Sequence, residues 1–89
     1  MTNLDELLDA YPEQEFLKAD GYDDCVIGLY EDKLVYSMTK MVRETMLTAD
    51  IDEREALEFL EYNVWSAYVG ELTPVFVDDL ALLDIYSIL

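Results

Sequence analysis

The chain has 89 residues, of which 21 are acidic and 5 are basic, so its formal net charge is -16; it contains one cysteine and no histidine. A chain of this length forms one domain, and its 53% hydrophobic content is too high for a disordered protein. The lack of histidine excludes Ser–His and Cys–His catalytic pairs and, together with a single cysteine, any common zinc site. We therefore expect a protein that is not an enzyme and holds no cofactor or metal.

The charge also limits the partners. An anionic surface is repelled by nucleic acids and by anionic membranes alike, so direct binding to either is not expected. A basic protein is the natural complement of this chain, with a homodimer as a further possibility.

The N-terminal third begins with a predicted helix over residues 3–10, where leucines recur at helical spacing. Asn3 and Glu6 have the spacing of an N-cap pair. Pro12 predicts a second short helical turn over residues 12–19, and Asp20-Gly21 then marks a stop.

Two β-branched and aromatic runs follow, at residues 25–30 and 34–37, and Glu31-Asp32-Lys33 between them predicts a hairpin with a three-residue loop. A third strand is expected over residues 75–77. Together these elements predict a single acidic α+β domain over residues 1–89. Its small, mostly antiparallel three-stranded sheet, hairpin 25–37 plus strand 75–77, is packed by helices.

Between the hairpin and the third strand, the spacing of the methionines predicts a helix that begins near Met38 and ends near residues 48–49. Asp52 and Glu55 have capping-box spacing and predict the start of the next helix, which should run to about Val69. A last helix, capped by Asp78, is expected over residues 79–89. Cys25 is interpreted as a core residue.

The helix predicted from residue 53 has two faces of interest. Leu57, Leu60 and Val64 form an ordinary core face, whereas the opposite side mixes acids with three large aromatics. Three interpretations remain open for this second face: burial between the sheet and other helices, a homodimer interface, or aromatic anchors presented to a foreign protein.

The acids elsewhere are consistent with the third interpretation. Asp23-Asp24 and Asp78-Asp79 flank predicted strands, where a weak cation site is an alternative to solvated turns and caps. The predicted partner-binding residues are nine: Glu55, Glu58, Phe59, Tyr62, Trp65, Asp23, Asp24, Glu31 and Asp32.

The size of the charge suggests a function. A compact domain of this length has a diameter of roughly 31 Å. Duplex DNA of that length carries about 18 phosphates, and the net charge of -16 is of the same order. A globule charged like a duplex can occupy a basic nucleic-acid channel.

Several segments also show a family resemblance. They are YDDCVIG at 22–28, LVYS at 34–37, KMV at 40–42, EALEFLEYNV at 55–64 and AYVGELTPVFV at 67–77. Over roughly residues 22–78 the chain resembles a loose group of small, acidic tailed-phage proteins of uncharacterised activity. The resemblance implies a phage source and expression in the host cytoplasm, and it assigns no functional residue.

Our leading hypothesis is a non-enzymatic phage protein that binds and occludes a basic, nucleic-acid-binding surface of a host defence or nucleic-acid-processing protein, as a DNA mimic does. The alternative is a structural phage accessory protein that assembles into a homo-oligomer. A third hypothesis is a small cation-dependent enzyme.

Overall fold

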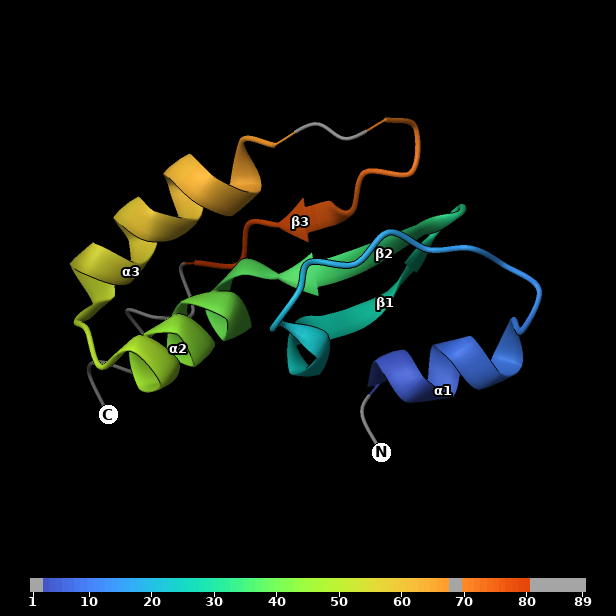
Figure 1. Cartoon of the computed structure of the whole chain (residues 1–89), viewed down its shortest axis with the longest axis horizontal. Coiled ribbons are helices and arrows are strands. Elements are labelled where there is room, and N and C mark those ends of the chain that lie inside the picture. Colours follow the sequence, from blue (N-terminus) through green and yellow to red (C-terminus); the bar gives the residue numbers. More distant parts are fainter. Residues whose placement is uncertain (1–2, 68–69, 81–89) are drawn as a thin grey trace.

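The chain folds into an elongated α+β domain in the computed structural model, which describes residues 3–67 and 70–80 (Figure 1). Its extents are 41 × 26 × 21 Å and its Cα radius of gyration is 13.4 Å. The molecule is thus longer than the roughly 31 Å sphere expected from its length. Helices α2 and α3 lie at one end of the long axis, the sheet lies in the middle, and α1 lies towards the other end (Figure 1).

The sheet has three strands, as expected: β1 is Val26–Tyr30, β2 is Lys33–Ser37 and β3 is Val75–Val77. Their order in the sheet is β1-β2-β3. The β1–β2 pair is antiparallel, whereas β3 runs parallel to β2. A parallel neighbour needs a long crossover, and the helices between residues 38 and 65 supply it. The sheet is therefore antiparallel in one of its two ladders.

The hairpin has a tighter turn than predicted. Lys33 pairs with Tyr30, so the loop contains only Glu31 and Asp32. The prediction of a three-residue loop was therefore wrong. Glu31 has φ 55°, a left-handed conformation that residues other than glycine adopt infrequently. The glycine that usually marks such a tight turn in a sequence is therefore missing here.

Helix α1, Asn3–Ala10, forms as predicted and packs against β1. The predicted second helical turn over residues 12–19 is wrong, because this segment has no helix and crosses the front of the sheet (Figure 1). Phe16 and Ala19 pack there against the core, and the Ala19 amide donates to the Tyr36 hydroxyl at 2.9 Å. These tertiary contacts override the local preference for a helix after Pro12.

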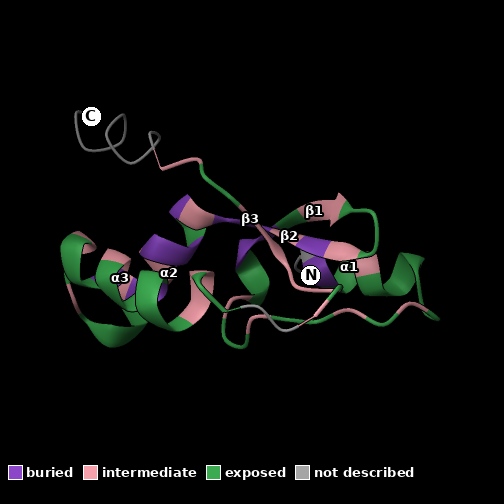
Figure 2. Ribbon diagram, turned by 90° about the horizontal axis from the view of Figure 1, so that it is seen from above, coloured by how far each residue is buried: buried purple, intermediate pink, exposed green. Residues whose placement is uncertain are grey.

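Helix α2, Met38–Ala49, confirms the predicted methionine stripe, since Met41, Val42 and Thr45 are buried. The Tyr36 ring packs against Phe76 of β3 in a tilted arrangement, with ring centroids 5.7 Å apart and an interplanar angle of 40°. Buried residues are concentrated in β2 and α2 (Figure 2). The core of the described chain is Leu4, Cys25, Val26, Leu34, Tyr36, Met41, Val42, Ala56 and Leu60.

The start of α2 is joined to the segment after β3. The Asp79 carboxylate accepts hydrogen bonds from the Ser37 hydroxyl at 2.6 Å and from the Thr39 amide at 2.8 Å. The Thr39 hydroxyl donates in return to the Asp79 carbonyl at 2.6 Å. A carboxylate is favourable at a helix N-terminus, so Asp79 caps a helix 40 positions earlier in the chain.

Helix α3, Glu53–Leu60, begins as predicted, because the Asp52 side chain accepts from the Glu55 amide at 2.8 Å. The prediction that this helix continues to Val69 was wrong. A π-helical segment, η2, covers Glu61–Trp65 and is followed by a turn at Ser66. The helix predicted over residues 79–89 lies almost entirely outside the described residues.

Candidate partner-binding surface

Four of the predicted binding residues form one exposed surface, which we call the outer face of α3: Glu55, Glu58, Phe59 and Tyr62. Phe59 is 46% exposed and Tyr62 is 81% exposed, and both carboxylates are exposed. Burial between layers is therefore the wrong interpretation of this face. Large exposed aromatics beside charged groups are typical of binding anchors.

The acids of this face keep most of their charge available to a partner. Arg54 lies 3.6 Å from Glu58 one helical turn away, but these side chains are 88% and 60% exposed. An ion pair in this environment contributes at most about 1 kcal/mol, so a partner cation can replace Arg54 at little cost.

Trp65 does not belong to this surface, contrary to prediction. It is half-buried against the core, with its indole Nε1 donating to the Met41 sulfur at 3.4 Å. The π-helical segment explains the change, because a π-turn inserts about one residue and so rotates later positions by about 100°. Trp65 is thereby turned towards the core, against which Val64 also packs.

The remaining four predicted residues lie elsewhere. Asp23 and Asp24 are exposed in the 3-10 helix η1, Asp23–Cys25, and Glu31 and Asp32 form the exposed β1–β2 turn. Helix α3 and this turn lie at opposite ends of the molecule (Figure 1). Eight of the nine residues are therefore distributed over three surface sites along the long axis, the ninth, Trp65, packs against the core, and the structure does not bring them together.

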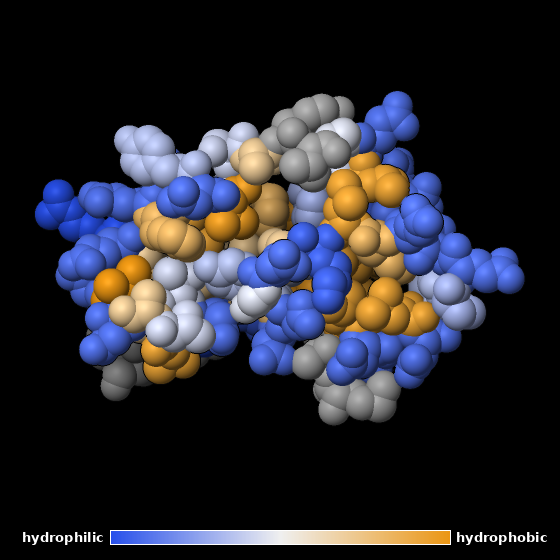
Figure 3. All heavy atoms as spheres, in the orientation of Figure 1, coloured by the Kyte–Doolittle hydropathy of each residue, from blue (hydrophilic) through white to orange (hydrophobic). Residues whose placement is uncertain are grey.

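The acidic surplus is nevertheless external. Of the twenty acids in the described residues, seventeen are exposed, three are half-buried and none is buried. The ion pairs Lys18–Asp23 and Arg54–Glu58 both lie at the surface. On the face shown in Figure 3, apolar patches lie between stretches of hydrophilic side chains. A partner would meet a surface of this mixed character.

Chemistry of other kinds finds little support in the described residues. Cys25 is buried, as predicted, and burial raises the pKa of its thiol to about 12, which leaves no thiolate at neutral pH. No group of three or more acids or cysteines in residues 3–67 and 70–80 is placed to hold a metal ion. No helix within these ranges has the length and apolarity needed to span a bilayer.

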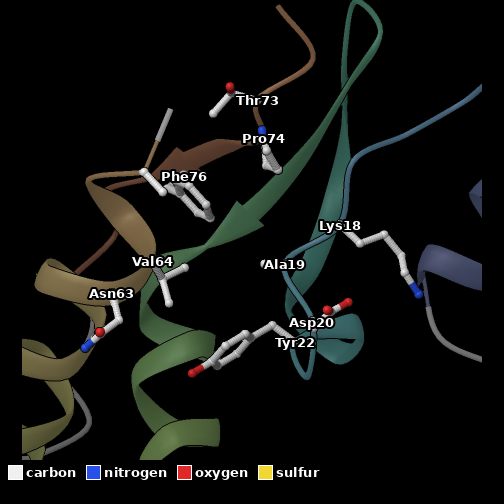
Figure 4. Close-up of a pocket in the computed structure, with 10 residues that line it drawn as sticks. Lys18, Ala19, Asp20, Tyr22, Asn63, Val64, Thr73, Pro74 and Phe76 are labelled. Carbon is white, nitrogen blue, oxygen red and sulfur yellow. The ribbon is translucent and has the colours of Figure 1, made fainter. Parts of the chain in front are cut away.

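Sequence reasoning missed a small pocket between the segment 18–22, the end of η2 and strand β3 (Figure 4). Its apolar lining is Ala19, Tyr22, Val64, Ala67, Pro74 and Phe76. These residues come from three distant parts of the chain, and none lies in a pattern that signals a binding site. Only the tertiary fold shows that they meet.

Comparison with known proteins does not add a function. The chain matches no protein-family model, and no curated protein or solved structure shows significant similarity to it.

Proposed function

We propose that this protein is a non-enzymatic phage protein that binds a basic, nucleic-acid-binding surface of a host protein and occludes it in the host cytoplasm. The observation that supports this proposal most is the exposure of the acids: none of the twenty described carboxylates is buried, against five cations in the whole chain. Folding therefore leaves nearly the full charge available for a partner.

The dimensions are compatible with mimicry of a duplex. Along its 41 Å length, duplex DNA carries about 24 phosphates, and this protein carries a net charge of -16 over the same distance. Association with a basic channel would release counterions from both partners, which makes the binding strongly dependent on salt. The outer face of α3 would then add specificity through Phe59 and Tyr62.

The same charge argues against self-assembly through this face. A two-fold interface places each surface patch against its own copy, so Glu55 and Glu58 would meet the acids of a second chain. Like charges facing each other in an interface are unfavourable. The alternative function, a structural phage accessory protein that assembles into a homo-oligomer, predicts a larger mass by light scattering; the proposed function predicts a monomer at moderate salt.

The proposal is tested by capture from a bacterial lysate on the immobilised protein. The wild type should retain a basic, DNA-binding protein at low salt and release it at high salt. A variant of the outer face, carrying Glu55→Gln, Glu58→Gln, Phe59→Ala and Tyr62→Ala, should bind that protein at least tenfold more weakly, since truncating one aromatic anchor typically costs that much.

A matched control removes the same chemistry from another exposed segment: Glu13→Gln, Glu15→Gln, Tyr11→Ala and Leu17→Ala. All four side chains are exposed, so the control loses two charges and two apolar groups without touching α3. It should bind within about threefold of the wild type. Equal losses in both variants, or the absence of any salt-sensitive basic partner, would contradict the proposal.

A further inference from the structure

The pocket between segment 18–22, η2 and β3 has the size of a single side chain. Its volume is about 200 Å³. A cavity of about 150 Å³ admits a benzene ring, whereas pockets for whole small ligands hold about 300–1,000 Å³. One aromatic or long aliphatic side chain therefore fits this pocket, and a complete cofactor or metabolite does not.

The walls of the pocket favour an apolar occupant. Val64, Phe76 and Tyr22 surround the open space, as Figure 4 shows. The polar atoms beside them already have partners within the protein: Tyr22 shares a 2.8 Å hydrogen bond with Thr45, and Asn63 donates to the Phe59 carbonyl at 2.9 Å. No buried side-chain oxygen or nitrogen of the described residues lacks a hydrogen-bond partner. A polar ligand would thus find few groups to bind.

The rim, in contrast, is charged and favours a cation. Asp20 is exposed at the edge of the pocket, and among the described residues it makes no hydrogen bond or ion pair. Lys18 points away from the pocket (Figure 4) and lies 3.8 Å from Asp23, so these two charges cancel in sum and Asp20 leaves a net negative charge beside the pocket. An apolar group that enters this pocket is therefore met by an unneutralised carboxylate.

We infer that this pocket receives one aromatic side chain of the basic partner, next to a lysine or arginine that pairs with Asp20. This identity of the occupant rests on the proposed function, because the partner is taken to be a basic protein. It adds an anchoring point to that function, separate from the outer face of α3. Buried aromatic anchors with a charged neighbour are a common source of binding energy at protein interfaces.

The test uses three phenyl probes of nearly equal size and different charge: phenethylamine, 2-phenylethanol and 3-phenylpropionate. Binding is followed at low salt by methyl chemical shifts of isotopically labelled protein. All shift changes should centre on Val64, Ala67 and Ala19, with millimolar affinity. Phenethylamine should bind roughly three- to fivefold more tightly than 2-phenylethanol, and 3-phenylpropionate most weakly.

Three variants locate the effect. Ala67→Phe fills the pocket from an exposed position and should abolish the shifts, whereas Ala49→Phe, at an exposed site outside the pocket, should leave them unchanged. Asp20→Asn should reduce the preference for the cationic probe, which the other acids still favour at low salt, and retain the binding of the neutral one. Unchanged circular dichroism in all three variants shows that the fold is retained.

Failure of the probes to bind, binding elsewhere on the protein, or an equal affinity for all three charges would overturn the inference. These outcomes do not depend on whether a partner is captured from the lysate. Capture without probe binding would refute the pocket and leave the proposed function standing. Probe binding without capture would refute the proposed function, and with it the assignment of the occupant to a basic partner, while the pocket would remain a binding site for a cationic phenyl group.

Discussion

Replacement of Asp79 by alanine should destabilise the fold far more than replacement of its neighbour Asp78. The Asp79 carboxylate accepts from Ser37 and from the Thr39 amide at the start of α2, and so links the segment after β3 to that helix. Asp78 is exposed, and within residues 3–67 and 70–80 its side chain accepts only a long 3.3 Å bond from the Leu80 amide. Either change removes one negative charge, so Asp78→Ala controls for the general effect of charge on stability.

The magnitude follows from the two hydrogen bonds. A hydrogen bond to a charged group contributes about 1.5–3 kcal/mol, and the half-buried position of Asp79 reduces the total for the pair to about 2–4 kcal/mol. The whole domain is expected to have about 4–13 kcal/mol of stability for its 89 residues. Asp79→Ala should therefore lower the urea midpoint clearly, and Asp78→Ala should change the free energy of unfolding by less than about 0.5 kcal/mol. Equal effects of the two substitutions would refute the reasoning.

The same pair of variants has a defined pH dependence. Burial alone would raise the pKa of Asp79, but the hydrogen bonds from Ser37 and Thr39 outweigh it and hold the pKa below its ordinary value of 3.8. A group with a lowered pKa stabilises the fold above its unfolded pKa, and this contribution is lost as the pH falls through the folded pKa. The difference in the free energy of unfolding between Asp79→Ala and Asp78→Ala should thus be constant above about pH 5 and shrink below pH 3.8.

Three further predictions concern the core and the charge. Tyr36→Phe should cost about 1–2 kcal/mol in urea unfolding, because it leaves the Ala19 amide without its acceptor, whereas Tyr30→Phe at a 59% exposed position should be nearly neutral. Cys25 should react with a thiol reagent at pH 8 only after unfolding, since burial raises its pKa to about 12; rapid labelling of the folded protein would show that the thiol is accessible. The melting temperature should rise with ionic strength, because the Debye length falls from about 30 Å at 0.01 M to about 3 Å at 1 M salt, and a flat dependence would mean that repulsion is not a significant cost.

Local signals in the sequence were sufficient for much of the fold. The capping pair Asp52 and Glu55, the helix at residues 3–10 and the methionine stripe of α2 each depend on residues within a few positions of one another. The third strand was also found, because its apolar run directly follows Pro74.

The errors arise where distant contacts decide the structure. The segment after Pro12 packs against the sheet instead of forming a helix. The direction of β3 was not predicted; it pairs in parallel with β2 because the intervening helices carry the chain back. Asp79 was read as a local feature, since its partners Ser37 and Thr39 lie about 40 positions earlier.

The candidate site, like the fold, could be predicted only where it depends on local sequence. Periodicity identified the outer face of α3, where Phe59 and Tyr62 are exposed. It could not anticipate the π-helical segment that turns Trp65 inwards, because the packing of its indole on Met41 is a tertiary contact. The pocket beside β3 needs three segments to meet, so no single stretch of sequence signals it.

The central claim is that the exposed acids occupy a surface that the partner otherwise uses for nucleic acid. The most direct measurement is a competition in which duplex DNA is titrated into the complex of this protein with its captured basic partner. We predict mutually exclusive binding, with DNA displacing the protein completely and the logarithm of the protein's binding constant falling linearly with the logarithm of the salt concentration. A stable ternary complex of protein, partner and DNA would contradict the claim.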